Sequence, residues 1–519
     1  MTAYNIAIVG GGAVGVCVFN ELVDQLVQLP NPERYNITIY DKTGVFGGGL
    51  AYGTQLDAHI LNMPANSMSA KSDDPQHFIK WLKEPHSNDL HSYFNIQARG
   101  NDFVPRSVFG LYLEDVLDKA LDKAQEFGIS TELKQDDIIN IQHQDGLMSV
   151  DSSSSHQLYN QTILCLGNQP PSVGSELCAT SGYFHQPWPE GELTKGIPKD
   201  SDVNILGSSL SAVDTLLTLL ENGHKGPINF ISRNGLLPKV RSFPKPYKLT
   251  ALSLENVQLS NDNEMKKVSF EKIVELFQTE LAQAGIEVPN VSIAQLQEKD
   301  SPLKILEADI QRVQEGKDNY FAVLKAVDDV ASDLWHAMSL PAKQTFDEHY
   351  KTLWNMYDYA MPMQNAQKVL QALQSGQLSV RSGFNNIEYN DQEKMFVIRC
   401  SDNEVFQSKY VVNAIGGGCD LTKMQSPLIQ NALKNDVFKP HPLGGIDVDF
   451  DTGRVKDKDN NCSDILYAVG SLTRGVHFYT NSILENAKAS KAVAFHVCNT
   501  LLSDNFEIQS IPQQGNTYE

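Results

Sequence analysis

The sequence predicts an α/β fold with two Rossmann-like dinucleotide-binding domains and a helical insertion. Two stretches carry the first part of this prediction, YNIAIVGGGAVG at residues 4–15 and VNILGSSLSAVD at residues 203–214. In each, an apolar strand-like run enters a small-residue turn and then a helical pattern. The third observation is a change of texture over residues 246–375, where charged helix-like segments end at glycines placed as C-caps, Gly285, Gly316 and Gly376.

The length of 519 residues is too great for one ordinary core, so two or three domains are expected. We assign residues 1–200 and 395–519 to the first dinucleotide-binding domain. Residues 201–245 and 376–394 are assigned to the second, and residues 246–375 to the helical insertion.

Charge and hydropathy exclude several classes of partner. The formal net charge of -21 argues against a nucleic-acid surface, which needs clustered positive charge. No apolar run approaches the length of a membrane span, so no membrane partner is expected. The N-terminus has no basic region before its apolar stretch, and the seven cysteines include no CxxC pair. We therefore expect reduced thiols and a cytoplasmic location.

The first turn has the spacing GxGxxG, with Gly10, Gly12 and Gly15 between a strand and a helix. The first glycine permits the tight turn, the second lets the backbone approach a pyrophosphate, and the third lets helix and strand pack closely. The helix that begins at Ala13 and Val14 offers free N–H groups and a partial positive charge to the phosphates.

Asp41 follows a second predicted strand and is expected to accept hydrogen bonds from ribose hydroxyls. Beyond it, residues 46–82 form a long glycine-rich excursion, whereas a plain dehydrogenase would enter a helix and strand within a few residues. Such an excursion can wrap an extended ligand. We therefore expect FAD in the first domain.

The order of motifs resembles the FAD/NAD(P)-binding proteins of the bacterial YdhS-like type, which are relatives of the flavin-dependent N-hydroxylating monooxygenases. The resemblance spans most of the chain except the helical middle section. It rests on GGGAVG at 10–15, GLAYGT at 49–54, LNMPANSMS at 61–69, DDPQHFIKWL at 73–82, FVPRSVFGLYL at 103–113, ILCLGNQPP at 163–171, YFHQPWP at 183–189, VNILGSSLSAVD at 203–214, FISRNGLLP at 230–238, VVNAIGGG at 411–418 and LYAVGSLTRG at 466–475.

The resemblance implies a glutathione-reductase-type arrangement in which matching residues contact FAD. Gly10, Gly12, Gly15 and Asp41 would hold the adenosine half. Gly167 and Gly416 would mark the two chain crossings near the cofactor, and Gly470 would approach the pyrophosphate and ribityl chain. The residues implied along or near the isoalloxazine are Asn62, Met63, Pro64 and Met68.

An alanine-rich helical run follows Thr480, Asn481 and Ser482, which are good N-caps. A helix N-terminus at Asn481 aimed at the flavin would stabilise its anionic reduced form. An ordinary capped C-terminal helix is the alternative, and the residues alone favour neither.

The second turn comprises Gly207, Ser208, Ser209 and Leu210, and Ser209 stands where the second glycine is usual. A Cβ there would keep a pyrophosphate at a distance, which indicates a decayed site. However, serine is small and its hydroxyl can donate to a phosphate oxygen. Ser211, Ala212 and Asp214 also resemble the GxGxSAxE turns of N-hydroxylating flavoenzymes.

Arg233 follows the next predicted strand, where an arginine reads a 2′-phosphate and an acid would read a 2′-hydroxyl. We therefore expect NADPH in preference to NADH. A loop arginine that packs on a neighbour is the alternative. Lys239 and Arg241 add positive charge near this site.

The insertion contains WNMYDYAMP at 354–362, where the resembled family tends to carry a basic run. Asp358 in this segment suits a cationic substrate such as an amine, or it faces water. The histidines show no HxxxH or HExxH spacing, so no metal site is expected.

Three functions remain open. The first is an FAD-dependent monooxygenase reduced by NADPH that hydroxylates a small amine or amino acid with dioxygen, through a flavin C4a-hydroperoxide. The second is an FAD-dependent dehydrogenase or reductase without oxygen insertion. The third is a non-catalytic flavin-binding module. The sequence leaves open whether the chain forms a homo-oligomer.

Overall fold

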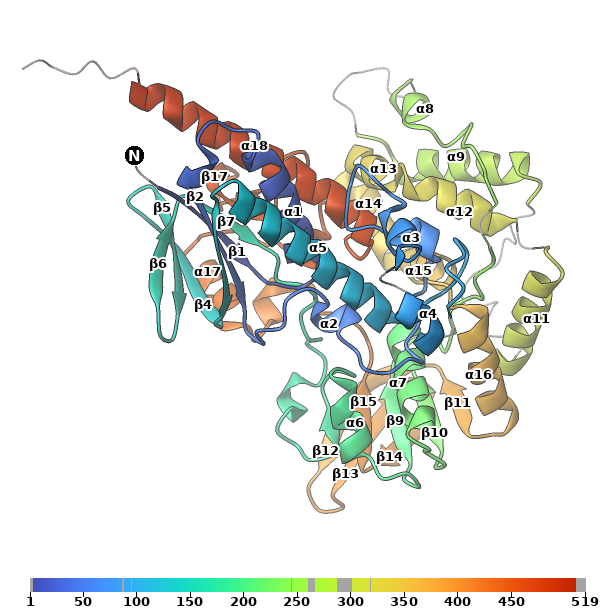
Figure 1. Cartoon of the computed structure of the whole chain (residues 1–519). Helices are drawn as coiled ribbons and strands as arrows, with labels where there is room; N and C mark the ends of the chain where they lie inside the picture. Colours follow the sequence, from blue (N-terminus) through green and yellow to red (C-terminus); the bar gives the residue numbers. More distant parts are fainter. Residues whose placement is uncertain are drawn as a thin grey trace, which may run out of the picture.

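The computed structural model describes residues 3–85, 88–94, 96–243, 245–259, 267–286, 301–317 and 319–509. It shows the predicted α/β fold with two parallel-sheet domains and a group of helices beside them (Figure 1). The first domain lies at the left of Figure 1, the second at the bottom, and the helices at the right.

The first domain is built on a six-stranded sheet with the order β16-β17-β7-β1-β2-β3. Its pairs are parallel except for β16 and β17, which are antiparallel. The strands are β1 (Tyr4–Val9), β2 (Tyr35–Asp41), β3 (Ser130–Gln135), β7 (Gln161–Leu164), β16 (Arg454–Lys456) and β17 (Cys462–Ala468).

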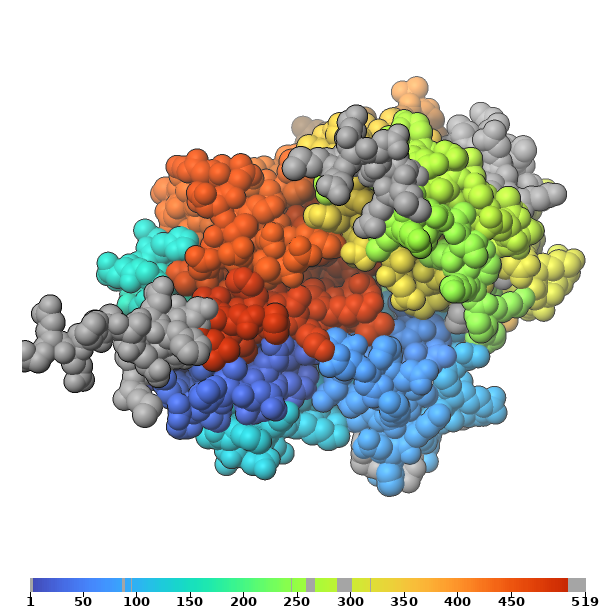
Figure 2. Space-filling model, turned by 90° about the horizontal axis from the view of Figure 1, so that it is seen from above, coloured from blue at the N-terminus to red at the C-terminus, as the bar shows by residue number. Residues whose placement is uncertain are grey.

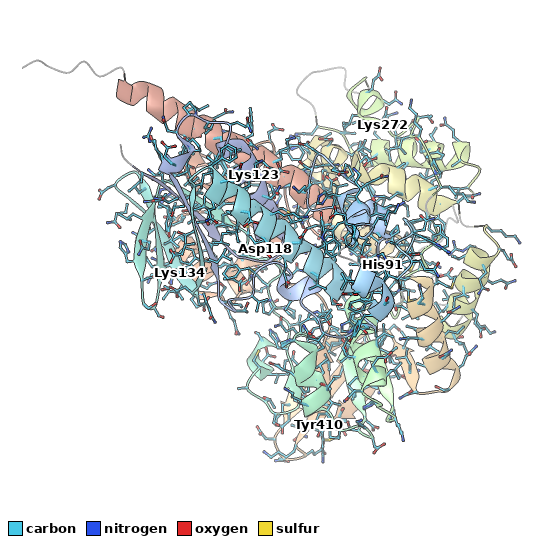
Figure 3. The ribbon with its side chains drawn as sticks, viewed as in Figure 1. His91, Asp118, Lys123, Lys134, Lys272 and Tyr410 are labelled. Carbon is cyan, nitrogen blue, oxygen red and sulfur yellow. The ribbon has the colours of Figure 1, made fainter. Side chains whose placement is uncertain are left out.

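Both faces of this sheet are covered, which explains the unbroken apolar run of β1. Ile6 and Ile8 pack in the core under three long helices, α1 (Ala13–Leu26), α5 (Arg106–Glu126) and α18 (Ile483–Gln509). Lys123 of α5, labelled in Figure 3, pairs with Asp24 of α1 at 2.6 Å. Shorter helices of this domain are α2 (Gly49–Tyr52), α3 (His77–Trp81) and α4 (Asn88–Phe94).

On the opposite face, Ala7 and Val9 pack in a second core. This core is shared with a three-stranded antiparallel sheet and one helix. These elements are β4 (Ile138–Gln144), β5 (Leu147–Ser152), β6 (His156–Tyr159) and α17 (Pro427–Lys434).

The second domain has a parallel five-stranded sheet with the order β11-β10-β9-β15-β8. Its strands are β8 (Tyr183–Phe184), β9 (Val203–Leu206), β10 (Ile228–Ile231), β11 (Leu378–Arg381) and β15 (Tyr410–Asn413). A small antiparallel sheet packs against it, formed by β12 (Phe384–Asn390), β13 (Met395–Cys400) and β14 (Val405–Ser408). The helices of this domain are α6 (Glu190–Gly196), α7 (Leu210–Glu221), α11 (Pro302–Gln314) and α16 (Met363–Gln374).

These assignments correct the predicted domain boundaries. β8 and β13–β15 belong to the second domain, although residues 1–200 and 395–519 were assigned to the first. Tyr410, labelled near the bottom of Figure 3, marks the start of β15. α11 and α16 also bury apolar residues in the core of the second domain, so they are not part of a separate insertion. A parallel strand needs a crossover helix, and α16 leads directly into β11.

The remaining helices form a group that we call the helical subdomain. Its members are α8 (Leu254–Leu259), α9 (Phe270–Gln283), α12 (Tyr320–Asp328), α13 (Ala331–Ala337), α14 (Leu340–His349) and α15 (Lys351–Asp358). Its core includes Phe478 and Tyr479, which precede α18 in the first domain. The subdomain therefore packs on the C-terminal segment, and Figure 2 shows its yellow surface meeting the red surface of that segment.

Glu280 anchors the start of the helical subdomain. Its fully buried carboxylate accepts hydrogen bonds from the backbone N–H groups of Thr250, Ala251 and Leu252, and from the hydroxyl of Tyr247 at 2.6 Å. Burial raises the pKa of Glu280, but these hydrogen bonds outweigh it and the net pKa is lowered. The carboxylate thus stays charged and holds the segment before α8.

Among the described residues, no helix is both long and apolar enough to cross a membrane. The seven cysteines are free thiols.

Candidate functional site

The first glycine turn joins β1 to α1 at the carboxyl edge of the first sheet. A Cβ on Gly10, whose φ is +114°, would lie 2.1 Å from the carbonyl oxygen of Cys165, which follows β7. A Cβ on Gly15 would lie 2.0 Å from the carbonyl oxygen of Gly10. Both positions therefore require glycine, as predicted for a turn that brings helix and strand into close contact.

Gly12 has a different role from the other two glycines. Its backbone is extended, with φ -75° and ψ -166°, and a Cβ would lie 3.4 Å from the Cα of Gly49. α1 begins after Gly12 without a side-chain cap and without an acidic residue in its first turn, which includes Ala13 and Val14. The helix N-terminus can therefore bind an anion, and the missing Cβ leaves room for a pyrophosphate to approach.

Asp41, at the end of β2, braces this turn. Its Oδ2 accepts a hydrogen bond from the N–H of Gly11 at 3.1 Å, and its Oδ1 accepts from the N–H and hydroxyl of Thr43 at 2.8 and 2.6 Å. A carboxylate has about four acceptor positions, so lone pairs remain for a ribose hydroxyl. Asp41 can therefore accept the hydrogen bonds from Gly11 and Thr43 and still accept one from a ribose hydroxyl, as predicted.

The predicted crossings lie together. Gln169 and Gly418 form an antiparallel bridge, so the segments that contain Gly167 and Gly416 run side by side between the two domains. Gly470 follows β17, and its ideal Cβ would lie 3.3 Å from the side chain of Val14 in α1. Gly470 therefore lies against the start of α1, and its approach to a pyrophosphate stays a prediction.

The residues expected along the isoalloxazine occupy one loop. Leu61 and Ala65 donate backbone hydrogen bonds to Val104 and Asp102, and the loop thus pairs with the segment before α5. Met68 is buried in the core of the first domain, where it packs beneath the helices. Asn62 and Met63 are half-buried, and Pro64 is buried. Met68 thus has a structural role, and the half-buried Asn62 and Met63 remain the candidates in this loop.

The second turn repeats the geometry of the first. A Cβ on Gly207 would lie 2.6 Å from the carbonyl oxygen of Ala414, just as Gly10 abuts Cys165. Ser209 has φ -93° and ψ -164°, which is nearly the conformation of Gly12, and its side chain is exposed. Leu210 begins α7, which also lacks a side-chain cap. Serine is therefore tolerated here without backbone strain, and its hydroxyl is free to face a ligand.

Ser208 is not positioned to bind a phosphate through its side chain. Its buried hydroxyl donates to the carbonyl oxygen of Leu236 at 2.6 Å and lies 2.8 Å from the hydroxyl of Ser232. These contacts tie the turn to the end of β10. Only the backbone N–H of Ser208 is left for the predicted role.

The predicted cations near the second turn have different positions. Arg233 is exposed at the carboxyl end of β10, as expected for a residue that reads a 2′-phosphate. Lys239 is buried in an ion pair with Asp309 at 3.0 Å. Arg241 is also buried, and its guanidinium donates hydrogen bonds to the carbonyl oxygens of Asp358 and Ala360. The side chains of Lys239 and Arg241, expected to add positive charge near this site, are therefore occupied by internal partners.

Asp358 ends α15 at the contact between the helical subdomain and the C-terminal segment. Its pKa is raised to about 7, mainly by burial and also by the charge of Asp328, while Arg241 opposes the rise. The next residue, Tyr359, has its hydroxyl near the side chain of Asn481. Asn481 is exposed, and the N-cap of α18 is Ser482, whose hydroxyl accepts from the N–H of Glu485 at 3.3 Å. Asp358 thus directly precedes a residue whose side chain lies near the predicted flavin contact Asn481.

The sequence analysis did not predict that the glycine-rich segment at residues 46–82 packs directly against the first glycine turn. Gly47 donates a backbone hydrogen bond to Gly11 at 2.9 Å, and Gly49 contacts Gly12. The triplet of glycines at 47–49 was a signal for such an approach. The positions of Tyr359 and Tyr479 at the contact between the helical subdomain and the C-terminal segment were also not predicted. They depend on how the helical subdomain packs.

A cavity of about 240 Å³ lies between α13, the loop after Phe450 and the first turns of α18. Its lining includes Gly470 and Thr480, and also the exposed side chains of Asp333 and Asp451.

The described part of the chain contains no group of three or more histidine, cysteine, aspartate or glutamate side chains that could hold a metal ion.

The first turn makes a specific prediction for Gly12→Ala. The backbone at Gly12 suits any residue and the nearest atom leaves room for a methyl group, so the variant is expected to fold. Its methyl group would occupy the approach to the pyrophosphate, and we expect the affinity for FAD to fall by about tenfold or more. Titration of apoprotein with FAD, followed by flavin fluorescence, measures this. Ser209→Ala is the matched control in the other turn, and unchanged FAD affinity in Gly12→Ala would contradict the assignment.

Comparisons with known proteins agree with this geometry. Residues 7–169 match a family model described as FAD-NAD(P)-binding. No curated protein matches the chain significantly. Among solved structures, the ornithine N-hydroxylase of Kutzneria sp. 744, in complex with reduced FAD, NADP+ and L-ornithine, is 13% identical with a TM-score of 0.57, over 96% of this chain and 99% of that one.

Two further structures are similar over nearly the whole chain. The L-lysine 6-monooxygenase of Pseudomonas syringae is 14% identical with a TM-score of 0.56, and the alignment covers 96% of this chain and 99% of that one. The cadaverine monooxygenase of Erwinia amylovora, bound to FAD, is 14% identical with a TM-score of 0.55, over 96% of this chain and 95% of that one. Residues 7–169 thus match the FAD-NAD(P)-binding family model, and the chain as a whole has the fold of the flavin-dependent N-hydroxylating monooxygenases.

Proposed function

We propose that this protein is an FAD-dependent oxidoreductase, reduced by NADPH, that hydroxylates the nitrogen of a small amine or amino acid with dioxygen. The observation that carries the proposal is the pair of matching glycine turns, at Gly10–Gly15 and Gly207–Ala212, in a fold shared end to end with N-hydroxylating enzymes. Two dinucleotide cradles on two sheets suit a reaction that passes reducing equivalents from one nucleotide to the other.

The first turn holds FAD in this proposal. Gly10 and Gly15 shape the turn, Gly12 and the N-terminus of α1 face the pyrophosphate, and Asp41 accepts from the ribose. When bound, FAD supplies the redox chemistry, accepting hydride from NADPH and activating dioxygen. The N-terminus of α18 near Asn481 would favour negative charge on the cofactor.

The second turn holds NADPH in this proposal. The N-terminus of α7 and the exposed Ser209 face the pyrophosphate. Arg233 lies after β10, at the position where such domains contact the adenine ribose. The extended backbone of Ser209 supports a working site, because a serine there costs no strain and can donate a hydrogen bond.

Asp358 is the proposed contact for a cationic substrate nitrogen. It directly precedes Tyr359, whose hydroxyl lies near Asn481, and this supports a place near the proposed flavin site. Arg241 balances part of its charge, so the attraction for an amine depends on whether the Asp358 carboxyl is ionised.

The proposed function is tested with purified protein. We expect a yellow protein whose flavin absorbance is bleached by NADPH without air. In air, ornithine, lysine or cadaverine should give an N-hydroxylated product in a yield that matches NADPH consumption. Product by mass spectrometry, oxygen uptake and peroxide release are measured together. Peroxide equal to the oxygen consumed with every amine would favour a reductase, and a colourless protein that takes up no FAD would contradict both enzymatic functions.

Arg233 gives a test of coenzyme choice. Because a guanidinium pairs with the 2′-phosphate, Arg233→Gln should weaken NADPH binding by about tenfold and leave NADH binding unchanged. The rate of flavin reduction against coenzyme concentration, in a stopped-flow instrument, gives both constants. The control is Arg399→Gln, since Arg399 is an exposed arginine of the same domain that pairs with Glu388. Equal effects on the two coenzymes would remove Arg233 from the site.

Asp358 gives a pH-dependent test. Its pKa is raised to about 7, so the carboxylate that attracts an amine is present above this pH and is lost as the pH falls through it. The groups that act on Asp358 are Arg241, Asp328, Lys325 and, from the C-terminal segment, Tyr479.

We therefore expect the KM for a cationic amine to fall as the pH rises through about 7. Asp358→Asn should raise the KM by about tenfold and flatten this profile. Steady-state oxygen uptake between mildly acidic and mildly basic pH measures it. Asp347→Asn is the control, because Asp347 forms an ion pair on the surface of α14. A profile that persists in Asp358→Asn would exclude this residue as the amine contact.

A further inference from the structure

A buried polar network joins the two dinucleotide-binding domains at one place. It links the start of α5 and the loop at residues 54–60, both from the first domain, to α7 of the second domain. α7 is the helix whose N-terminus forms the second cradle, and α5 begins where the loop of Asn62 and Met63 pairs with its neighbour. The network therefore lies between the two proposed cofactor sites.

Its centre is an ion pair between Arg106 and Asp214. The guanidinium of Arg106 lies 2.8 Å from the carboxylate of Asp214, with side-chain exposures of 15% and 5%. Arg106 also donates to the carbonyl oxygen of Ile60 at 3.4 Å, and its guanidinium lies 5.8 Å from the ring centre of Trp188. A buried carboxylate is stable only with a partner, so Asp214 holds α7 to Arg106.

His59 makes a second link to the same turn of α7. Its Nε2 lies 2.9 Å from the hydroxyl oxygen of Thr218 and 3.2 Å from the carbonyl oxygen of Asp214. Its Nδ1 lies 2.7 Å from the hydroxyl oxygen of Thr54, which in turn donates to Glu190 at 3.1 Å. Burial lowers the pKa of His59, so the ring is neutral and each nitrogen can serve one partner.

The position of this network in the fold gives it a consequence beyond packing. Asp214 is four residues after Leu210, the first residue of α7, so fixing Asp214 also fixes the direction of the helix N-terminus. Hydride transfer is sensitive to misplacement of the reacting groups by about 1 Å. A group that fixes the second cradle relative to the first therefore acts on the rate of this step and not on nucleotide affinity.

We propose that Arg106 and Asp214 are positioning residues for hydride transfer between the two dinucleotides, with His59 as their support. The pair fixes the position of the N-terminus of α7 relative to the loop of Asn62 and Met63. This inference rests on the proposed function, because it requires that NADPH reduces a flavin. Neither side chain contacts the reacting atoms in this account.

The test is a double-mutant cycle with Arg106→Gln, Asp214→Asn and the double variant, each prepared with FAD. We expect each single variant to slow flavin reduction at saturating NADPH by about tenfold. The Kd for NADPH and the FAD content should be unchanged. The long-wavelength charge-transfer absorbance between nicotinamide and flavin should be lost. The double variant should be no slower than the slower single variant, since the two side chains act as one unit.

Glu221→Gln is the matched control. Glu221 ends α7 and pairs with Lys368 of α16 at 2.8 Å, within the second domain and on its surface. It should leave the reduction rate unchanged. Full rates in both single variants, additive losses in the double variant, or a loss confined to the Kd for NADPH would overturn the proposal.

A second measurement separates this proposal from the proposed function. Hydrogen–deuterium exchange of the FAD-loaded protein is followed at residues 54–60 and 210–218. Faster exchange there in Asp214→Asn, but not in Glu221→Gln, is expected whether or not NADPH reduces the flavin. If the unaltered protein is not reduced by NADPH, the proposed function fails. Unchanged exchange in Asp214→Asn would overturn the positioning role by itself.

Discussion

The structure depends on the close contact between each glycine turn and the strand beside it. In the first sheet, Gly10 lies against the backbone after β7, and in the second sheet Gly207 lies against the backbone after β15. A side chain at either position would force the strand and the helix apart by the width of a methyl group. The N-termini of α1 and α7 are held at the sheet edges by these contacts. An anion-binding helix N-terminus is useful only at such an edge, where the neighbouring strands leave a crevice.

The helical subdomain depends in turn on the C-terminal segment. Phe478 and Tyr479 enter its core, and Tyr359 reaches Asn481 at the start of α18. The segment between β17 and α18 therefore serves both units, with Gly470 against α1 at one end and the helical subdomain at the other. Because Asp358 adjoins this contact, the helical subdomain meets the first domain beside the residue that we propose as the amine contact.

The sequence predicted local features well where a single short stretch contains the whole cause. The two turns, the helix start after Gly12 and the helical character of the insertion were predicted correctly, since strand–turn–helix geometry depends on neighbouring residues. The failures have a common origin. Lys239 and Arg241 were expected to add positive charge near the second turn, but their side chains bind Asp309 and Asp358, which come from segments far along the chain. β15 was assigned to the wrong domain for the same reason, because strand pairing is a long-range choice.

The two cradles and their order along the chain can be derived from the sequence alone, because the required small residues are local and adjacent. Which side chains are available to a ligand follows instead from the packing of the folded chain. Ser208 is used to tie its turn to β10, Arg233 is left exposed, and Arg106 is paired with Asp214 across the domain boundary. Whether a polar group is free or internally paired depends on its neighbours in space. Those neighbours are set by the packing of distant segments, which the spacing of residues in a motif does not encode.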